Sequence, residues 1–155
     1  MKAQVALPAK LISVFEGKAD VRGAYGGRGS GKTRSFAKMA AIKGYIYGKQ
    51  GIAGQILCAR QFMNSLDDSS LEECKRAIEE EPFLLDYYEV GGKYIKSKDG
   101  LIWFSFAGLD RNINSVKSKG RILLCWVDEA EPVTEGAWQI LEPTLREEGD
   151  DWNAE

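Results

Sequence analysis

One stretch of eight consecutive residues constrains the fold of this chain more than any other: Gly26-Gly27-Arg28-Gly29-Ser30-Gly31-Lys32-Thr33. It matches the pattern G-x-x-x-x-G-K-[ST] of a phosphate-binding loop. Glycines lack a Cβ, so the backbone can adopt positive φ angles and approach a phosphate chain closely. The amides of such a loop form a nest of donors at the positive end of the following helix. We therefore expect these residues to bind a nucleotide.

Two side chains of the loop have defined roles in this interpretation. Lys32 is expected to reach the β- and γ-phosphates, and the Thr33 hydroxyl to ligate the Mg²⁺ that bridges them. The alternative is a glycine-rich turn with an incidental lysine. The context favours the phosphate site, because residues 21–25 have the composition of a short strand and helical periodicity follows Thr33.

Size and composition indicate one globular domain. The chain has 155 residues, of which 44% are apolar and 28% are charged. No run approaches the length of a membrane span, and the N-terminus lacks the features of a signal peptide, so we expect a cytoplasmic protein. A net charge of -2 gives no evidence for nucleic-acid binding, so a DNA partner would require a local basic patch.

Cysteine and histidine usage narrows the chemistry. The three cysteines form no C-x-x-C pair, and we expect them to be buried hydrophobic residues rather than disulfides or zinc ligands. The sequence contains no histidine, which excludes histidine-dependent catalysis and histidine-ligated metals. Any general base must therefore be a carboxylate.

A second informative stretch is residues 122–129, an apolar run that ends in Asp128 and Glu129. A run of this kind predicts a strand buried on both faces. The two acids would then lie at the C-terminal edge of the sheet, where parallel α/β folds place their ligands. Asp128 is expected to hold the water shell of the metal opposite Thr33, and Glu129 to polarise an attacking water.

The segments between these two stretches predict alternating helices and strands. Helical spacing follows the loop, where Gly44 is expected to weaken the helix and Gly48 with Gly51 to end it. Residues 55–60 predict a buried parallel strand, and the next helix is expected to begin at an Asn64-Ser65 cap and to stop at Pro82. Three β-rich runs at 87–90, 93–96 and 101–106 are separated by hairpin signals.

The last third of the chain adds a basic stretch and a helix. Residues 112–121 are expected to form a solvated loop, which is also the best local candidate for contacting DNA phosphates through Lys117, Lys119 and Arg121. A final helix is predicted after a Thr134 cap. Its expected inner face consists of Trp138, Leu141 and Leu145.

Four of these segments together resemble the N-terminal ATPase region of tailed-bacteriophage terminase large subunits. They are the glycine-rich loop, Ile-Leu-Cys-Ala-Arg-Gln at 56–61, Cys-Trp-Val-Asp-Glu-Ala-Glu at 125–131, and Trp-Gln-Ile-Leu-Glu-Pro-Thr-Leu-Arg at 138–146. The resemblance covers nearly the whole chain. Its most specific pieces are the Gly-Gly-Arg-Gly-Ser loop and the Trp-Val-Asp-Glu-Ala strand end, which generic P-loop kinases do not share.

The resemblance implies an α/β P-loop NTPase fold of the additional-catalytic-glutamate class, with three layers and a mainly parallel central sheet. It implies hydrolysis of ATP with Mg²⁺, coupled to movement of double-stranded DNA into a procapsid. The implied partners are the DNA, the portal, the small terminase subunit and further copies of the chain, without a membrane. The implied location is the cytoplasm of the bacterial host.

Residue roles carried over by the resemblance agree with the analysis above. Lys32 and Thr33 would contact phosphate and Mg²⁺, Asp128 would serve as the metal-side acid, and Glu129 as the base. Arg28 matches a position proposed in this family as an arginine finger, and a surface phosphate clamp is the alternative. Arg60 would contact the nucleotide or relay to DNA.

The chain is shorter than the family pattern. Residues 1–155 would form a single ATPase domain that lacks the following coupling strand and the nuclease domain. That strand would lie between residues 21–25 and the strand ending at Asp128, so without it we expect poor ATP binding and slow turnover. Two other functions stay open: a small-molecule kinase, and a non-catalytic nucleotide-binding or assembly module.

Overall fold

The computed structural model describes residues 3–62, 70–111, 113–117, 120–150 and 152–155. Their helices are α1 (Ala9–Phe15), α2 (Lys32–Lys49), α3 (Ser70–Glu79), α4 (Pro82–Tyr87), α5 (Ile113–Lys117), α6 (Glu135–Leu141) and the 3₁₀ turn η1 (Glu142–Thr144). Their strands are β1 (Gly54–Arg60), β2 (Tyr88–Val90), β3 (Ile95–Ser97), β4 (Ile102–Gly108), β5 (Ile122–Val127), β6 (Glu148–Gly149) and β7 (Trp152–Asn153).

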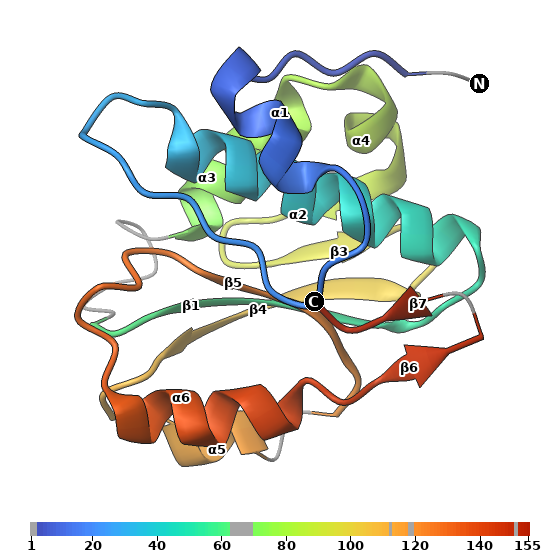
Figure 1. Ribbon diagram of the computed structural model, residues 1–155. Helices are drawn as coiled ribbons and strands as arrows, with labels where there is room; N and C mark the ends of the chain where they lie inside the picture. The colour runs from blue at the N-terminus through green and yellow to red at the C-terminus, as the bar shows by residue number, and fades with distance from the viewer. Residues whose placement is uncertain (1–2, 63–69, 112, 118–119, 151) are drawn as a thin grey trace.

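A five-stranded sheet in the order β2-β3-β4-β1-β5 forms the middle layer. The three longest strands are parallel, with β1 between β4 and β5, and β2 and β3 add an antiparallel edge. Helices α1 to α4 lie on one side of the sheet and α5 and α6 on the other (Figure 1). The α/β class and its mainly parallel sheet are confirmed, as are the three predicted β-runs between residues 87 and 106.

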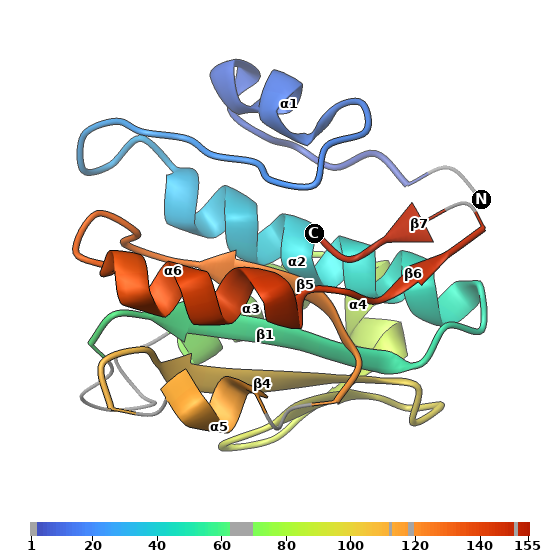
Figure 2. The ribbon, with the colours of Figure 1, turned by 60° about the horizontal axis from the view of Figure 1, so that its bottom comes forward.

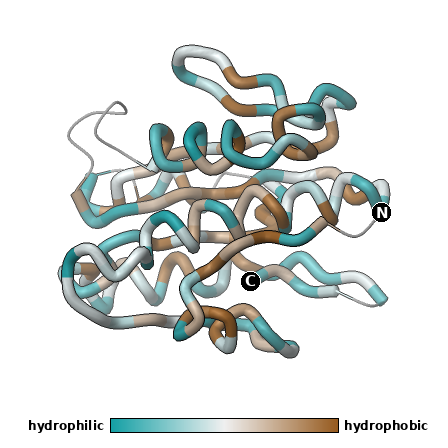
Figure 3. The backbone as a smooth tube through the Cα atoms, turned by 90° about the horizontal axis from the view of Figure 1, so that it is seen from above, coloured by the Kyte–Doolittle hydropathy of each residue, from teal (hydrophilic) through white to brown (hydrophobic). Residues whose placement is uncertain are grey.

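Strand β1 divides the hydrophobic core in two because its side chains alternate between the faces of the sheet. Ile56 and Cys58 join the core that contains α2 and α3, whereas Leu57 and Ala59 join the core under α5 and α6. All four are fully buried. Figure 3 shows the corresponding hydrophobic colour along the strands that cross the middle of the molecule. This two-sided burial explains why the strand is a continuous apolar run.

Helix α2 extends through Gly44 and Gly48 and ends at Lys49, just before Gly51 with its φ of 77°, so the predicted end near Gly48 and Gly51 is confirmed. A Cβ at Gly44 would lie 2.6 Å from the Tyr88 hydroxyl, and one at Gly48 would overlap the Tyr87 hydroxyl. The Tyr88 hydroxyl donates a hydrogen bond of 2.8 Å to the Ala41 carbonyl. The glycines therefore allow the helix to pack closely on the sheet and its tyrosines, and this packing offsets their low helix propensity.

The strand predicted at residues 21–25 is wrong. The segment is extended, but none of the strands in the described part of the chain pairs with it. Val21 and Tyr25 are 80% and 102% exposed. Figure 2 shows this segment running over α2, apart from the sheet. A strand requires a hydrogen-bonded neighbour, and β5, the last strand of the sheet, is not joined to this segment.

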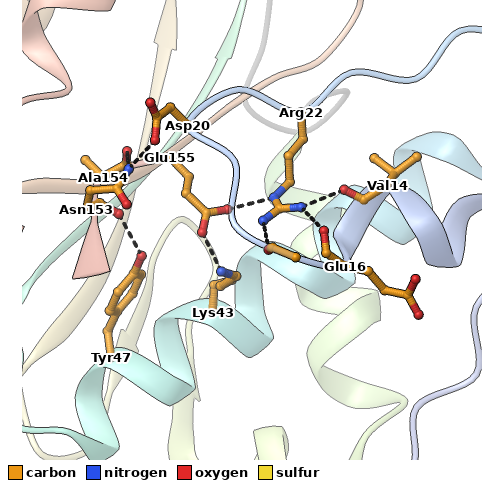
Figure 4. Close-up of polar contacts among 10 residues, drawn as sticks. Val14, Glu16, Asp20, Arg22, Lys43, Tyr47, Asn153, Ala154 and Glu155 are labelled. Atoms are coloured by element: carbon orange, nitrogen blue, oxygen red, sulfur yellow. Dashed lines mark hydrogen bonds and ion pairs between the residues drawn. The ribbon is translucent and has the colours of Figure 1, made fainter. Parts of the chain in front are cut away.

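The C-terminal residue Glu155 holds that segment in place instead (Figure 4). Its carboxylate accepts hydrogen bonds from Arg22 Nε at 3.0 Å and from Lys43 Nζ at 2.5 Å. Its backbone bonds to Leu123 and Cys125 on the open side of β5. Arg22 also donates to three carbonyls at the end of α1 and beyond it: those of Val14, Glu16 and Gly17.

Burial and the nearby Glu155 charge raise the pKa of Tyr47 to about 12. This tyrosine donates a hydrogen bond of 3.3 Å to the Asn153 carbonyl and packs its ring on Trp152. The phenol therefore stays protonated at neutral pH. Through these two contacts Tyr47 attaches the C-terminal segment to α2.

Other expectations need smaller corrections. Residues 113–117 form α5 rather than loop. The final helix ends at Leu141 and continues as η1; Leu141 is buried, but Trp138 is 38% exposed and does not face the core. The Thr134 cap is confirmed by a hydrogen bond from the Ala137 amide. The Asn64-Ser65 cap lies outside the described residues.

The remaining sequence expectations concern thiols and membrane segments. Cys58 and Cys74 are buried free thiols with sulfurs 3.9 Å apart, and Cys125 is half-buried. Burial, the Cys74 contact and neighbouring charges raise the pKa of the Cys58 thiol well above its usual value. Within the described residues, none of the helices has the length and apolar character needed to cross a membrane.

The close packing of α2 predicts an unusual response to a helix-favouring substitution. Gly44→Ala should lower the free energy of unfolding by about 1–3 kcal/mol, because the new methyl group collides with Tyr88 and Ile102. The measurement is chemical denaturation. Gly136→Ala in α6 is the matched control, since nothing lies near its added Cβ, and it should be neutral or slightly stabilising. Equal effects of the two substitutions would contradict this account.

Candidate nucleotide-binding site

The glycine-rich loop lies immediately before α2 and has the backbone that its composition predicts. Gly26, Gly29 and Gly31 have φ angles of 157°, 76° and 78°, which residues with a Cβ adopt at a cost. Gly31 is the N-cap of α2, and Lys32 is its first residue. The unpaired amides of the first helical turn therefore point into the loop, where they favour an anion.

Lys32 folds back over the loop that precedes it. Its ammonium donates to the carbonyls of Gly26 and Gly27 at 2.6 and 3.1 Å, and to the Ser30 hydroxyl at 2.8 Å. These contacts hold the lysine at the mouth of the nest with its charge facing the loop. A phosphate that entered the nest would meet the same ammonium.

Asp128 lies beside the start of α2, one residue after β5 ends. Its Oδ1 accepts a hydrogen bond of 3.3 Å from the Thr33 hydroxyl, and its backbone amide donates to the Ala59 carbonyl of β1 at 2.9 Å. The residue is 7% exposed. The pairing of β5 with its parallel neighbour β1 thus places Asp128, which follows β5, beside the glycine-rich loop at residues 26–33.

Arg60 is the residue of this site that sequence reasoning assigned differently. It ends β1, and its guanidinium donates to Asp128 Oδ2 from Nε at 3.0 Å and from Nη2 at 2.5 Å. The sequence contains one indication that Arg60 belongs to the site: it lies at the C-terminal end of a buried strand, as Asp128 does. That position does not reveal the partner, because the pairing depends on which strands are neighbours.

Glu129 and Arg28 complete the predicted set. Glu129 has a φ of 54° and is exposed. A positive φ at a residue with a side chain costs energy and is found preferentially at functional sites. This backbone conformation at Glu129 turns the chain away from the direction of β5. The side chains of Asp128 and Glu129 therefore do not point to opposite faces of the sheet as successive residues of a strand would. Arg28 is exposed in the turn of the loop.

The donor set fits a magnesium–nucleotide complex. Thr33 and Asp128 provide a hydroxyl and a carboxylate oxygen, which are the ligand types that Mg²⁺ prefers. Among the described residues no cluster of three or more histidine, cysteine or acidic side chains forms a metal cage. Mg²⁺ in proteins usually keeps several waters and takes other ligands from phosphates, so the two oxygens of Thr33 and Asp128 are compatible with it.

The basic residues predicted to contact DNA lie elsewhere. Lys117 ends α5, and Arg121 precedes β5 at the opposite edge of the sheet from Asp128, with an ion pair to Glu147. Lys119 lies outside the described residues. Arg121 therefore has an acidic neighbour inside the chain, and the structure does not place it beside the glycine-rich loop.

Comparison with known families identifies the chain. The family model described as phage terminase large subunit matches residues 18–153, which include the glycine-rich loop, β1, β5 and Asp128. A search of curated protein sequences finds no significant match. The family match covers most of the chain, so this protein belongs to the phage terminase large subunit family.

Proposed function

We propose that this chain is the ATP-hydrolysing motor domain of its terminase large subunit and has a P-loop NTPase fold. Membership of this family indicates a role in packaging phage DNA. The observation that carries the proposal is the contact between Thr33 and Asp128, which brings an acid from the end of β5 to the helix that follows the glycine-rich loop.

In this proposal the loop binds the triphosphate of ATP. The backbone amides of residues 26–33 donate to the phosphate oxygens, and Lys32 exchanges its contacts with loop carbonyls for contacts with the β- and γ-phosphates. Thr33 and Asp128 would hold Mg²⁺, Thr33 through its hydroxyl and Asp128 partly through water. Held there, the ion would supply positive charge that offsets the negative charge of the phosphates.

Hydrolysis requires a group that orients water, and Glu129 is our assignment for it. It adjoins Asp128 but is exposed, so it is free to accept a hydrogen bond from a water near the γ-phosphate. Arg28 is exposed in the loop and contributes positive charge to the phosphates, as a finger toward the transition state or as a clamp on the ground state. A finger lowers kcat when removed, whereas a clamp raises KM.

The working complex in this proposal contains double-stranded DNA, the portal, the small terminase subunit and further copies of the chain, in the cytoplasm of the bacterial host. DNA would act as an activator of hydrolysis rather than as a phosphate acceptor. ATP hydrolysis that rises with duplex DNA and needs no acceptor supports the motor over a small-molecule kinase.

One prediction of this function concerns nucleotide binding. Lys32→Ala should weaken binding of a fluorescent ATP analogue by about 10- to 100-fold, because one charge-assisted contact to the phosphates is lost. Fluorescence anisotropy with Mg²⁺ measures it. Lys93→Ala, at an exposed lysine between β2 and β3, is the matched control and should leave affinity unchanged. Unaltered binding by Lys32→Ala would remove the basis of the proposal.

Another prediction separates nucleotide binding from hydrolysis. Glu129→Gln should reduce the rate of phosphate release by about 10²- to 10⁴-fold and change nucleotide affinity by no more than about threefold, because the amide cannot act as a base. Glu131→Gln, at an exposed acid two residues away, is the control. If the two variants hydrolyse ATP equally well, Glu129 is not the base.

A further inference from the structure

The side chain of Asp128 forms an ion pair with a positively charged residue of the protein, Arg60. The two carboxylate oxygens of Asp128 have different partners. Oδ1 accepts a hydrogen bond from the Thr33 hydroxyl, and Oδ2 accepts two hydrogen bonds from the Arg60 guanidinium. The Arg60 and Asp128 side chains are only 22% and 8% exposed. The ion pair is therefore largely shielded from water.

A carboxylate this buried is costly unless a positive charge or several hydrogen bonds compensate it. Arg60 supplies both through one planar guanidinium. A divalent ion near the same carboxylate would be attracted by its negative charge and repelled by the positive charge of the guanidinium. Arg60 and a metal therefore compete electrostatically for Asp128, even where each contacts a different oxygen.

We propose that Arg60 is the resident counter-ion of Asp128 and restricts divalent cations at this carboxylate to those that arrive with nucleotide phosphates. The inference rests on the proposed function for its nucleotide step. The phosphates add negative charge next to Thr33, which offsets the repulsion by Arg60 and makes the metal favourable. Without a nucleotide, the Asp128 carboxylate is already compensated by Arg60 and attracts free Mg²⁺ less strongly.

The test measures divalent-ion binding without nucleotide. Thermal unfolding of the full chain is followed with and without millimolar MgCl₂, at matched ionic strength. The wild-type melting temperature should not change with Mg²⁺. Arg60→Gln should melt about 5–10 °C lower without Mg²⁺, because a buried carboxylate loses its partner, and should regain much of this loss when Mg²⁺ is added. Arg60→Lys keeps the charge and should show no Mg²⁺ response.

A direct binding measurement accompanies the thermal one. Free Mn²⁺ is counted by its electron paramagnetic resonance signal in nucleotide-free protein. Arg60→Gln should bind an ion that wild type and Arg60→Lys do not bind. The double variant Arg60→Gln/Asp128→Asn lacks the carboxylate and should lose both the extra ion and the Mg²⁺ response. It should also melt above Arg60→Gln, because no unpaired charge is left.

Several outcomes would overturn the proposal. The first is that wild type and Arg60→Gln bind metal equally, and the second is that the melting temperature of Arg60→Gln does not respond to Mg²⁺. The third is that Arg60→Gln no longer binds nucleotide in the absence of metal, which would make Arg60 a nucleotide ligand. If Arg60→Gln does not fold, failure of the double variant to recover folding also overturns it. Failure of the proposed function is distinct, because it appears as wild-type protein that binds no nucleotide.

Discussion

The carboxylate of Asp128 joins the three elements on which this site depends. Asp128 directly follows β5. Its carboxylate accepts a hydrogen bond from Thr33 in α2 and forms an ion pair with Arg60 at the end of β1. Residues far apart in the sequence are thereby fixed around the mouth of one glycine-rich loop. Because Asp128 is nearly buried, its partners must be correctly placed, and the position of α2 over the sheet becomes a requirement for the site.

That position is determined at the other end of α2. Gly44 and Gly48 allow the helix to approach Tyr87, Tyr88 and Ile102, and any larger residue there would hold it away from the sheet. The first turn of the helix, with Lys32 and Thr33, then lies where β5 ends. The packing of two glycines and the geometry of the phosphate loop are thus parts of the same arrangement.

Local patterns in the sequence predicted the loop, the buried strands β1 and β5, the β2–β3–β4 run and the Thr134 cap, because each depends on neighbouring residues. Residues 21–25 have the composition of a strand, but a strand also needs a partner, which the described chain does not give them. The pairing of Arg60 with Asp128 and the attachment of Arg22 to Glu155 link residues 68 and 133 positions apart. No local pattern reveals such contacts. The roles of Lys32, Thr33 and Asp128 in binding nucleotide and metal, and those of Glu129 and Arg28, stay predictions.

The most direct measurement is a structure of the protein with a non-hydrolysable ATP analogue and Mg²⁺. The account predicts the triphosphate inside residues 26–33, the metal bound to the Thr33 hydroxyl, and Asp128 hydrogen-bonded to a water of the metal. A nucleotide bound elsewhere, or a metal distant from both Thr33 and Asp128, would contradict the account.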